Sequence, residues 1–229
     1  MSRRYGLRQH KTVVVHFLFV MRGDCVVKLS ICIPAYNPGH WLFGILESLR
    51  KQTEQHPDTE VIVVDDGSTE DLSWIRDKGF ALYYRHDKNL FEGKTRNDLM
   101  ALAVGEYIQF IDADDEIYPN ALDVIYDNIE KGFDFVSYEF ATDNDVSRSY
   151  HNRGQLMVNC PVWAYTFRKE FTGGELFNEQ MQVGVDVDWL KRVLRDDAVH
   201  WHDDRAWLNY RFDGNDNSIC HRYLRGELK

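Results

Sequence analysis

Residues 60–68 read Glu-Val-Ile-Val-Val-Asp-Asp-Gly-Ser, a run of aliphatic residues that ends abruptly in polar turn residues. An apolar run closed in this way is typical of a buried strand that stops at a turn. Upstream, residues 29–34 (LSICIP) form a second such run. Residues 41–52, which lie between the two runs, carry apolar side chains at helical spacing. Together these segments predict a strand–helix–strand unit.

The alternation of strands and helices continues towards the carboxyl terminus. We expect a short helix at 72–77, a strand at 81–85, a helix at 95–103, a strand at 107–111 and a helix at 119–130. The pattern then loosens to a strand at 135–140, a polar loop at 143–154, a helix at 184–195 and an aromatic tail from Trp201 to Ile219. This order predicts an α/β fold with a mostly parallel central sheet. Without an internal repeat or a low-complexity linker, we expect one domain.

Composition and charge narrow the class of protein. The chain has 229 residues, of which 44% are hydrophobic, and a formal net charge of −10. That acidic balance argues against a nucleic-acid partner, which needs a basic face. A small phosphorylated ligand stays open, because a bound divalent cation can invert the local field. The four cysteines form no Cys-x-x-Cys pair, so we expect neither a zinc site nor a disulfide framework.

The first 27 residues are expected to be an extension outside a core domain at 28–229. Four basic residues precede an apolar run at 13–21 that is interrupted by His16 and lacks a small-residue cleavage site. The run is shorter than the ~20 apolar residues that span a bilayer as a helix. An added strand or surface helix, a membrane-contacting segment and a leader before a true start at Met21 all stay open. The simplest compartment is the cytoplasm, with peripheral contact at the inner face of the membrane left open.

Three predicted strands end in polar clusters. These are Pro34-Ala35-Tyr36-Asn37, Asp65-Asp66-Gly67-Ser68 and Asp112-Ala113-Asp114-Asp115. In open α/β sheets, ligands bind beyond the carboxyl ends of the strands, and parallel strands bring those ends to one edge. Any single cluster is explained by a capped turn, but three clusters at one edge predict a binding site.

Asp112 and Asp114 are the candidate metal ligands. Carboxylates directly after a buried strand offer hard oxygen ligands for Mg²⁺ or Mn²⁺, which proteins hold with one or two carboxylates and the phosphates of the substrate. An EF-hand is disfavoured, because Ile117 stands at the loop position that needs Gly. A solvated acidic turn is the alternative reading of the same residues.

The order of three motifs resembles the family 2 glycosyltransferases. The motifs are LSICIPAYN at 29–37, VIVVDDGS at 61–68 and GEYIQFIDADD at 105–115, and the resemblance extends over about 28–220. It implies the GT-A fold, in which a nucleotide-binding α/β half is joined to an acceptor-binding half. It also implies inverting transfer of a sugar from a nucleotide-diphosphate donor, such as a UDP-sugar, to a hydroxyl of a glycan or lipid-linked saccharide.

The resemblance assigns the donor site to the ends of the strands. The implied donor-binding residues are Pro34, Ala35, Tyr36, Asn37, Asp66, Arg96, Asp112 and Ala113. Tyr36 would lie against the base, Asp66 would accept a hydrogen bond from uracil N3, and Asp112 and Asp114 would hold the metal. Arg96 and Asn97 match the Ala-Arg-Asn segment of the family, so Arg96 would meet phosphate or brace Asp112, with an ordinary surface arginine as the alternative.

One loop departs from the pattern of the family. Residues 86–89 open the region before the Arg96 helix and are expected to approach the nucleotide. The family usually has Gly two residues after Asn89, whereas Phe91 stands there and Gly93 follows. This substitution leaves the backbone path of the loop open.

The acceptor side is implied by the later part of the chain. Gly184-Val185-Asp186-Val187-Asp188-Trp189 resembles the Gly-Glu-Asp-x-x-[Phe/Trp] segment of the family, which makes Asp186 the base, with Asp188 as second choice. Val185 replaces the usual Glu. Both aspartates can also be read as helix N-terminal carboxylates. Trp163 is expected to stack on a sugar or to be a core residue, and Arg211, in a tail that resembles a lid, to approach the phosphates.

Two other classes of protein remain as alternatives. A sugar nucleotidyltransferase shares a similar nucleotide half, but it carries a Gly-rich basic loop that residues 34–39 lack. A noncatalytic nucleotide-sugar-binding protein is the second alternative, because of Val185 and the shifted glycine. The sugar and the acceptor depend on loops that carry no readable code.

Overall fold

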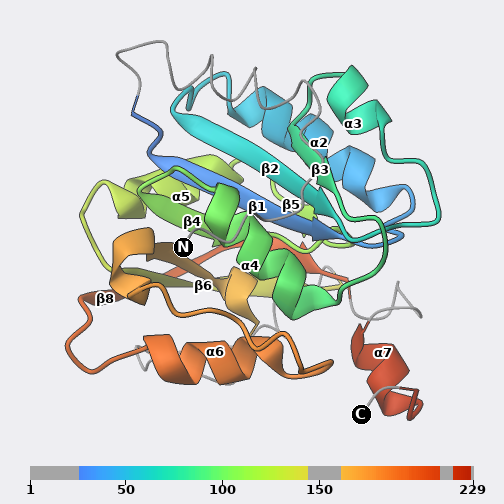
Figure 1. The fold of residues 1–229 in the computed structure, drawn as a ribbon. Helices are drawn as coiled ribbons and strands as arrows, with labels where there is room; N and C mark the ends of the chain where they lie inside the picture. The colour runs from blue at the N-terminus through green and yellow to red at the C-terminus, as the bar shows by residue number, and fades with distance from the viewer. Residues whose placement is uncertain (1–25, 144–160, 212–218, 228–229) are drawn as a thin grey trace, which may run out of the picture.

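The structure is a computed structural model that describes residues 26–143, 161–211 and 219–227. These form a single eight-stranded sheet in the order β3-β2-β1-β4-β7-β6-β8-β5 (Figure 1). The strands are β1 (Leu29–Ala35), β2 (Thr59–Asp65), β3 (Leu82–Arg85), β4 (Tyr107–Phe110), β5 (Glu116–Ile117), β6 (Phe135–Thr142), β7 (Tyr165–Arg168) and β8 (His200–Tyr210). The expected α/β fold is confirmed.

The first half of the sheet is parallel. Strand β1 pairs in parallel with β2 and with β4, and β2 pairs in parallel with β3. Because the apolar runs are buried on both faces, helices cover both sides, as in other parallel sheets. Helix α4 (Glu92–Leu102) packs on β1 and β2 on the face turned to the viewer in Figure 1. Helices α2 (Trp41–Gln52) and α5 (Ala121–Ile129) cover the opposite face, and α3 (Trp74–Asp77) precedes β3.

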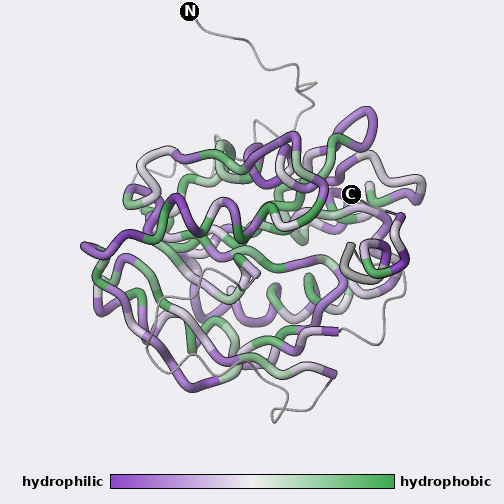
Figure 2. Tube along the Cα trace, turned by 90° about the horizontal axis from the view of Figure 1, so that it is seen from below, coloured by the Kyte–Doolittle hydropathy of each residue, from purple (hydrophilic) through white to green (hydrophobic). Residues whose placement is uncertain are grey.

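The second half of the sheet mixes directions. Strand β7 pairs antiparallel with both β4 and β6, whereas β8 runs parallel to β6 and antiparallel to β5. Helix α6 (Val185–Val193) lies below this half in Figure 1, and α7 (Ile219–Leu224) stands apart near the carboxyl end. Two 3₁₀ turns, η2 (Val162–Ala164) and η3 (Lys169–Thr172), flank β7. In Figure 2 the hydrophobic stretches of the tube lie mostly in the interior, and the hydrophilic ones are frequent at the outer turns.

Several boundaries differ from the predictions. Helix α4 begins at Glu92 rather than at residue 95. This start is not evident from the sequence, because the first turn is polar and Phe91 at the N-cap is not a capping residue. Strands β5 and β7 were not predicted, since they are two and four residues long. The aromatic tail contains the eleven-residue strand β8, whose side chains alternate less regularly because the pairing with β6 contains register shifts.

Most of the expected extension, residues 1–25, and most of the expected polar loop, residues 144–154, lie outside the described residues. Within the described ranges, no helix is long and apolar enough to cross a membrane.

Candidate active site

The carboxyl ends of β1, β2 and β4 meet at one edge of the sheet. In the parallel register Ala35 pairs with Asp65, and the next backbone amide, Asp66 N, donates to Ala35 O at 2.7 Å. On the other side of β1, Ile111 N donates to Cys32 O at 3.1 Å, immediately before the acidic cluster. The parallel pairing therefore gathers all three predicted clusters at the same edge.

Asp65 organises the turn that follows β2. It is fully buried, and its Oδ1 accepts Ser68 N at 2.8 Å while its Oδ2 accepts the hydroxyl of Tyr83 at 2.7 Å and the guanidinium of Arg85. Gly67 in this turn has a φ of 74°, and a Cβ there would lie 2.4 Å from the carbonyl carbon of Lys88. The turn thus needs glycine both for its backbone conformation and for the close approach of the 86–91 loop.

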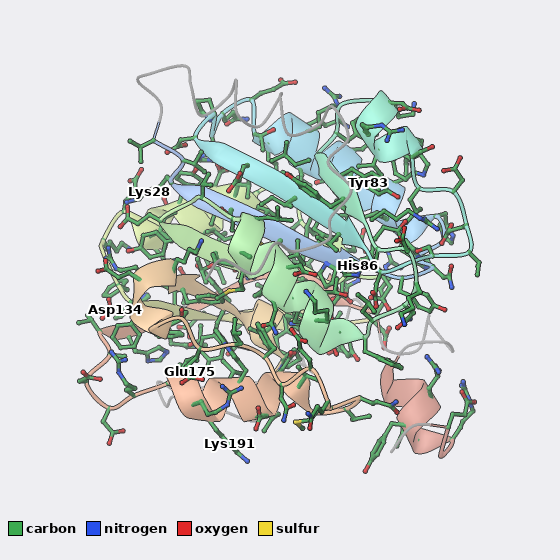
Figure 3. The ribbon with its side chains drawn as sticks, viewed as in Figure 1. Lys28, Tyr83, His86, Asp134, Glu175 and Lys191 are labelled. Atoms are coloured by element: carbon green, nitrogen blue, oxygen red, sulfur yellow. The ribbon has the colours of Figure 1, made fainter. Side chains whose placement is uncertain are left out.

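Asp66 has different partners from Asp65. Its Oδ1 lies 2.7 Å from Nδ1 of His86 and accepts Leu90 N at 2.8 Å, and Nε2 of His86 lies 2.9 Å from Asp98. Burial alone would lower the pKa of His86, but hydrogen bonds to the two carboxylates raise it to about 9. Figure 3 shows His86 at the end of the sheet where β1 and β2 finish. An imidazolium therefore orients Asp66 and leaves its second oxygen for another partner.

The loop after β1 is fastened to the turn after β2. Asn37 N donates to Oγ of Ser68 at 2.9 Å, and Oδ1 of Asn37 accepts Thr69 N at 2.8 Å. The Tyr36 side chain next to it is 45% exposed, which leaves its ring available to a ligand. Pro34 and Ala35 belong to the strand itself, and Ala35 is buried.

The acidic cluster after β4 brings three aspartates of different burial close together. Asp112 and Asp114 are partly exposed, whereas Asp115 is buried and its Oδ2 has no hydrogen-bond partner among the described residues. Burial raises the pKa of Asp112; Arg96 opposes that effect, and the nearby carboxylates Glu92 and Asp114 add to it. The pKa of Asp115 also lies well above its ordinary value, chiefly through burial. Crowded carboxylates with a buried orphan oxygen fit the binding of a divalent cation.

Arg96 connects this cluster to the predicted base. The guanidinium is fully buried, and it donates to Glu92 and to Oδ1 of Asp112 at 3.2 Å. Its Nη1 lies 3.1 Å from Oδ1 of Asp186. The rings of Phe110 and Phe177 lie within 6 Å of the guanidinium carbon, at 5.3 and 5.8 Å. Arg96 is therefore no surface arginine, and one cation joins three carboxylates.

Asp186 and Asp188 lie in different environments. Oδ2 of Asp186 accepts Val162 N at 2.9 Å, and burial raises the pKa of its carboxyl while Arg96 opposes the rise. Asp188 is exposed by about a third and pairs with Arg192, one turn further along α6, at 2.8 Å. Asp186 thus joins the group at the strand ends, whereas Asp188 belongs to the outer face of α6.

Trp163 is buried in the core, whereas Arg211 lies at the candidate site. Trp163 is 1% exposed and packs on Phe140 and Tyr210, so it is the core residue and not the expected sugar-stacking surface. Arg211 does lie at the acidic cluster: its backbone amide donates to Asp115 at 3.1 Å, and its guanidinium carbon is 4.2 Å from the centre of the Trp41 ring.

One residue of the site was missed in the sequence, and two were named without a role. Glu92 could have been found, because it precedes Arg96 by four residues on one helix. Asp115 was counted in the cluster but was given no role, since burial is a tertiary property. Asn97, matched only by motif, donates to Phe177 O and Glu179 at 3.0 Å and so fastens α4 to the segment before α6.

A second group of metal-ligand types lies elsewhere on the sheet. Ligand atoms of Glu139, His202 and Asp204 lie within 4.8 Å of one another, on β6 and β8, and this group includes none of the strand-end aspartates. Asp204 is 96% exposed, and His202 lies 3.3 Å from Glu139, so an ion pair accounts for the arrangement as it stands.

Comparison with known families identifies the family of the chain. Residues 30–194 match the model of Glycosyl transferase family 2. The chain belongs to this family. The GT-A fold is confirmed by a Staphylococcus aureus TarS structure in complex with UDP-GlcNAc, which superposes with a TM-score of 0.68 at 21% identity over 82% of this chain and 59% of that one.

The chain is also similar in sequence to curated glycosyltransferases. An uncharacterised glycosyltransferase of Rickettsia felis is 29% identical over 175 residues, which are 69% of this chain and 29% of that protein. Glycosyltransferase GlyG of Streptococcus pneumoniae is 27% identical over 204 residues, which are 85% of this chain and 64% of that protein. The chain spans less than a third of the length of the Rickettsia protein.

Proposed function

We propose that the chain is an inverting glycosyltransferase that moves a sugar from a nucleotide-diphosphate donor, a UDP-sugar, to a hydroxyl of a saccharide acceptor. The observation that carries the proposal is the buried guanidinium of Arg96, which lies between Asp112 and Asp186. Arg96 thereby brings Asp112, the candidate carboxylate on the phosphate side, close to Asp186, the candidate base. The UDP-GlcNAc complex of TarS supports the choice of donor.

Each end of the site has a separate role. Tyr36 and the free oxygen of Asp66 bind the base of the nucleotide. Asp112 and Asp114 would hold a Mg²⁺ or Mn²⁺ ion, and a bound ion would supply Lewis-acid stabilisation for the leaving diphosphate. The backbone amide of Arg211 binds Asp115, and its guanidinium binds Glu116 beside the acidic cluster.

Asp186 acts as the general base. Its buried carboxylate has a raised pKa, which suits a group that accepts a proton near neutral pH. It takes the proton from the acceptor hydroxyl while that oxygen attacks the anomeric carbon, so the product linkage is inverted. The residue before it, Val185, is buried in the core and provides no carboxylate of its own.

The test is transfer and donor hydrolysis with a panel of UDP-sugars, with and without Mn²⁺, using wild type, Asp114→Asn and Asp196→Asn. Asp196 is an exposed aspartate distant in sequence from the cluster and serves as the matched control. We expect metal-dependent UDP release from wild type and the control, and a loss of at least about 100-fold in Asp114→Asn. Full activity in Asp114→Asn would refute the metal assignment, and UDP-sugar binding without any release would favour a noncatalytic binding protein.

A further inference from the structure

Phe91 has a backbone conformation that phenylalanine rarely adopts. Its φ is 69° and its ψ is 165°, a region occupied almost only by glycine. The other non-glycine residues with positive φ in the described ranges are Asn37 and Asp143, at 48° and 50°. Asn and Asp tolerate that conformation through their short polar side chains. Phe91 has no such explanation, and it stands where the resemblance to the family leads one to expect glycine.

The surrounding hydrogen bonds hold Phe91 in this conformation. Leu90 N donates to Asp66 at 2.8 Å, and Phe91 N donates to Oδ1 of Asn89 at 2.9 Å. The carbonyl of Phe91 accepts Thr95 N at 3.2 Å and the hydroxyl of Thr95 at 3.1 Å. These hydrogen bonds hold the backbone at residue 91 in a conformation that suits glycine. The conformational strain therefore falls on Phe91.

Packing in the core does not account for the aromatic side chain. Phe91 is 46% exposed, whereas phenylalanines that stabilise the core, such as Phe110 and Phe177, are at most 2% exposed. A half-exposed ring gains little from burial, so the strain is not offset by core packing. Strained residues that persist without such compensation are concentrated at ligand sites.

The residues on either side of Phe91 contact two different parts of the candidate site. The preceding residue, Leu90, binds Asp66 through its amide, at the end of the site assigned to the base. The following residue, Glu92, binds Arg96, which contacts Asp112 at the end assigned to the diphosphate. Phe91 therefore stands in the chain between one residue that contacts the Asp66 end and one that contacts the Arg96 end.

We propose that Phe91 is a donor-contacting residue whose ring packs against the nucleoside of the UDP donor. The inference rests on the proposed function, because it takes the strand ends as the donor site. An aromatic ring at this place adds an apolar surface for the flat ring of a base or the carbon face of ribose. Glycine would relieve the strain and remove that surface, so stability and donor binding change in opposite directions.

The experiment measures melting temperature and UDP affinity, by calorimetry in Mn²⁺, for wild type and three variants at this position. We expect Phe91→Gly to melt about 2–4 °C higher and to bind UDP roughly 5- to 20-fold more weakly. Phe91→Ala keeps a Cβ in the strained conformation, so it loses affinity without the gain in melting temperature. Phe91→Tyr retains wild-type affinity.

The control is Trp201→Ala, which removes a ring of similar exposure, 47%, at the amino end of β8 and leaves UDP affinity unchanged. UDP and UDP-sugars should lose affinity equally in Phe91→Gly; a loss confined to UDP-sugars, or none, overturns the inference. A lower melting temperature for Phe91→Gly would also overturn it. Wild type that fails to bind UDP would instead overturn the proposed function itself.

Discussion

Nη1 of Arg96 lies 3.1 Å from Oδ1 of Asp186, although the two residues belong to different helices in different halves of the sheet. The contact is buried, and it links the helix that packs on the parallel half of the sheet to the candidate base. Because the same guanidinium also binds Asp112, a shift of α6 relative to α4 would disturb both ends of the site.

Arg96→Met should be among the most damaging single substitutions. The change keeps an unbranched side chain but leaves the partly buried carboxylates at 92, 112 and 186 without their cation, which costs about 3–5 kcal/mol. Urea unfolding measures the loss, and Arg50→Met, which removes an exposed arginine of α2, should cost under about 1 kcal/mol. Equal stability of the two variants would contradict the bridging role.

Gly93→Ala should destabilise the protein, against the usual rule for helices. Alanine is ordinarily preferred to glycine in a helix by about 1 kcal/mol. A Cβ at residue 93, however, would lie 2.7 Å from the backbone oxygen of Asn178, so we expect a loss of about 1–3 kcal/mol. Gly44→Ala is the control, because nothing lies within 4 Å of its added Cβ and the normal gain of about 0.5–1 kcal/mol should appear. If both variants gain stability, α4 and the segment before α6 are not in close contact.

His86→Gln should change how stability depends on pH. The pKa of His86 in the folded protein, about 9, lies above its ordinary 6.5, so its charge stabilises the fold fully below pH 6.5. This contribution falls as pH rises from 6.5 and is lost above about 9, by an amount on the order of 3 kcal/mol. Unfolding at a series of pH values should show this decline in wild type and not in His86→Gln.

Asp186→Asn should lower turnover by at least about 100-fold while UDP still binds, because only proton transfer is lost. Asp188→Asn, two residues along the same helix, should retain turnover near that of wild type, since Asp188 pairs with Arg192 on the outer face of α6. Steady-state kinetics and calorimetry on both variants separate catalysis from binding. Unchanged turnover in Asp186→Asn would reassign the base.

The local sequence pattern determined the parallel half of the fold. It also determined which polar residues follow each of the three strands. Each of the runs at 29–34, 60–64 and 107–111 is apolar and closed by turn residues, so each formed the expected strand. Parallel pairing then required the clusters to share an edge. The motif order also indicated the family, which the match to residues 30–194 confirms.

Only the tertiary structure decided which members of those clusters share one environment. Asp65 and Asp66 are identical neighbours in sequence, yet one is bound by Tyr83 and Arg85 and the other by His86. Trp163 became a core residue through packing between strands that lie far apart in the chain. The link from Arg96 to Asp186 spans 90 positions, and no local propensity encodes it. These differences in burial and charge pairing depend on which distant segments of the chain come into contact. A local sequence pattern does not encode such contacts.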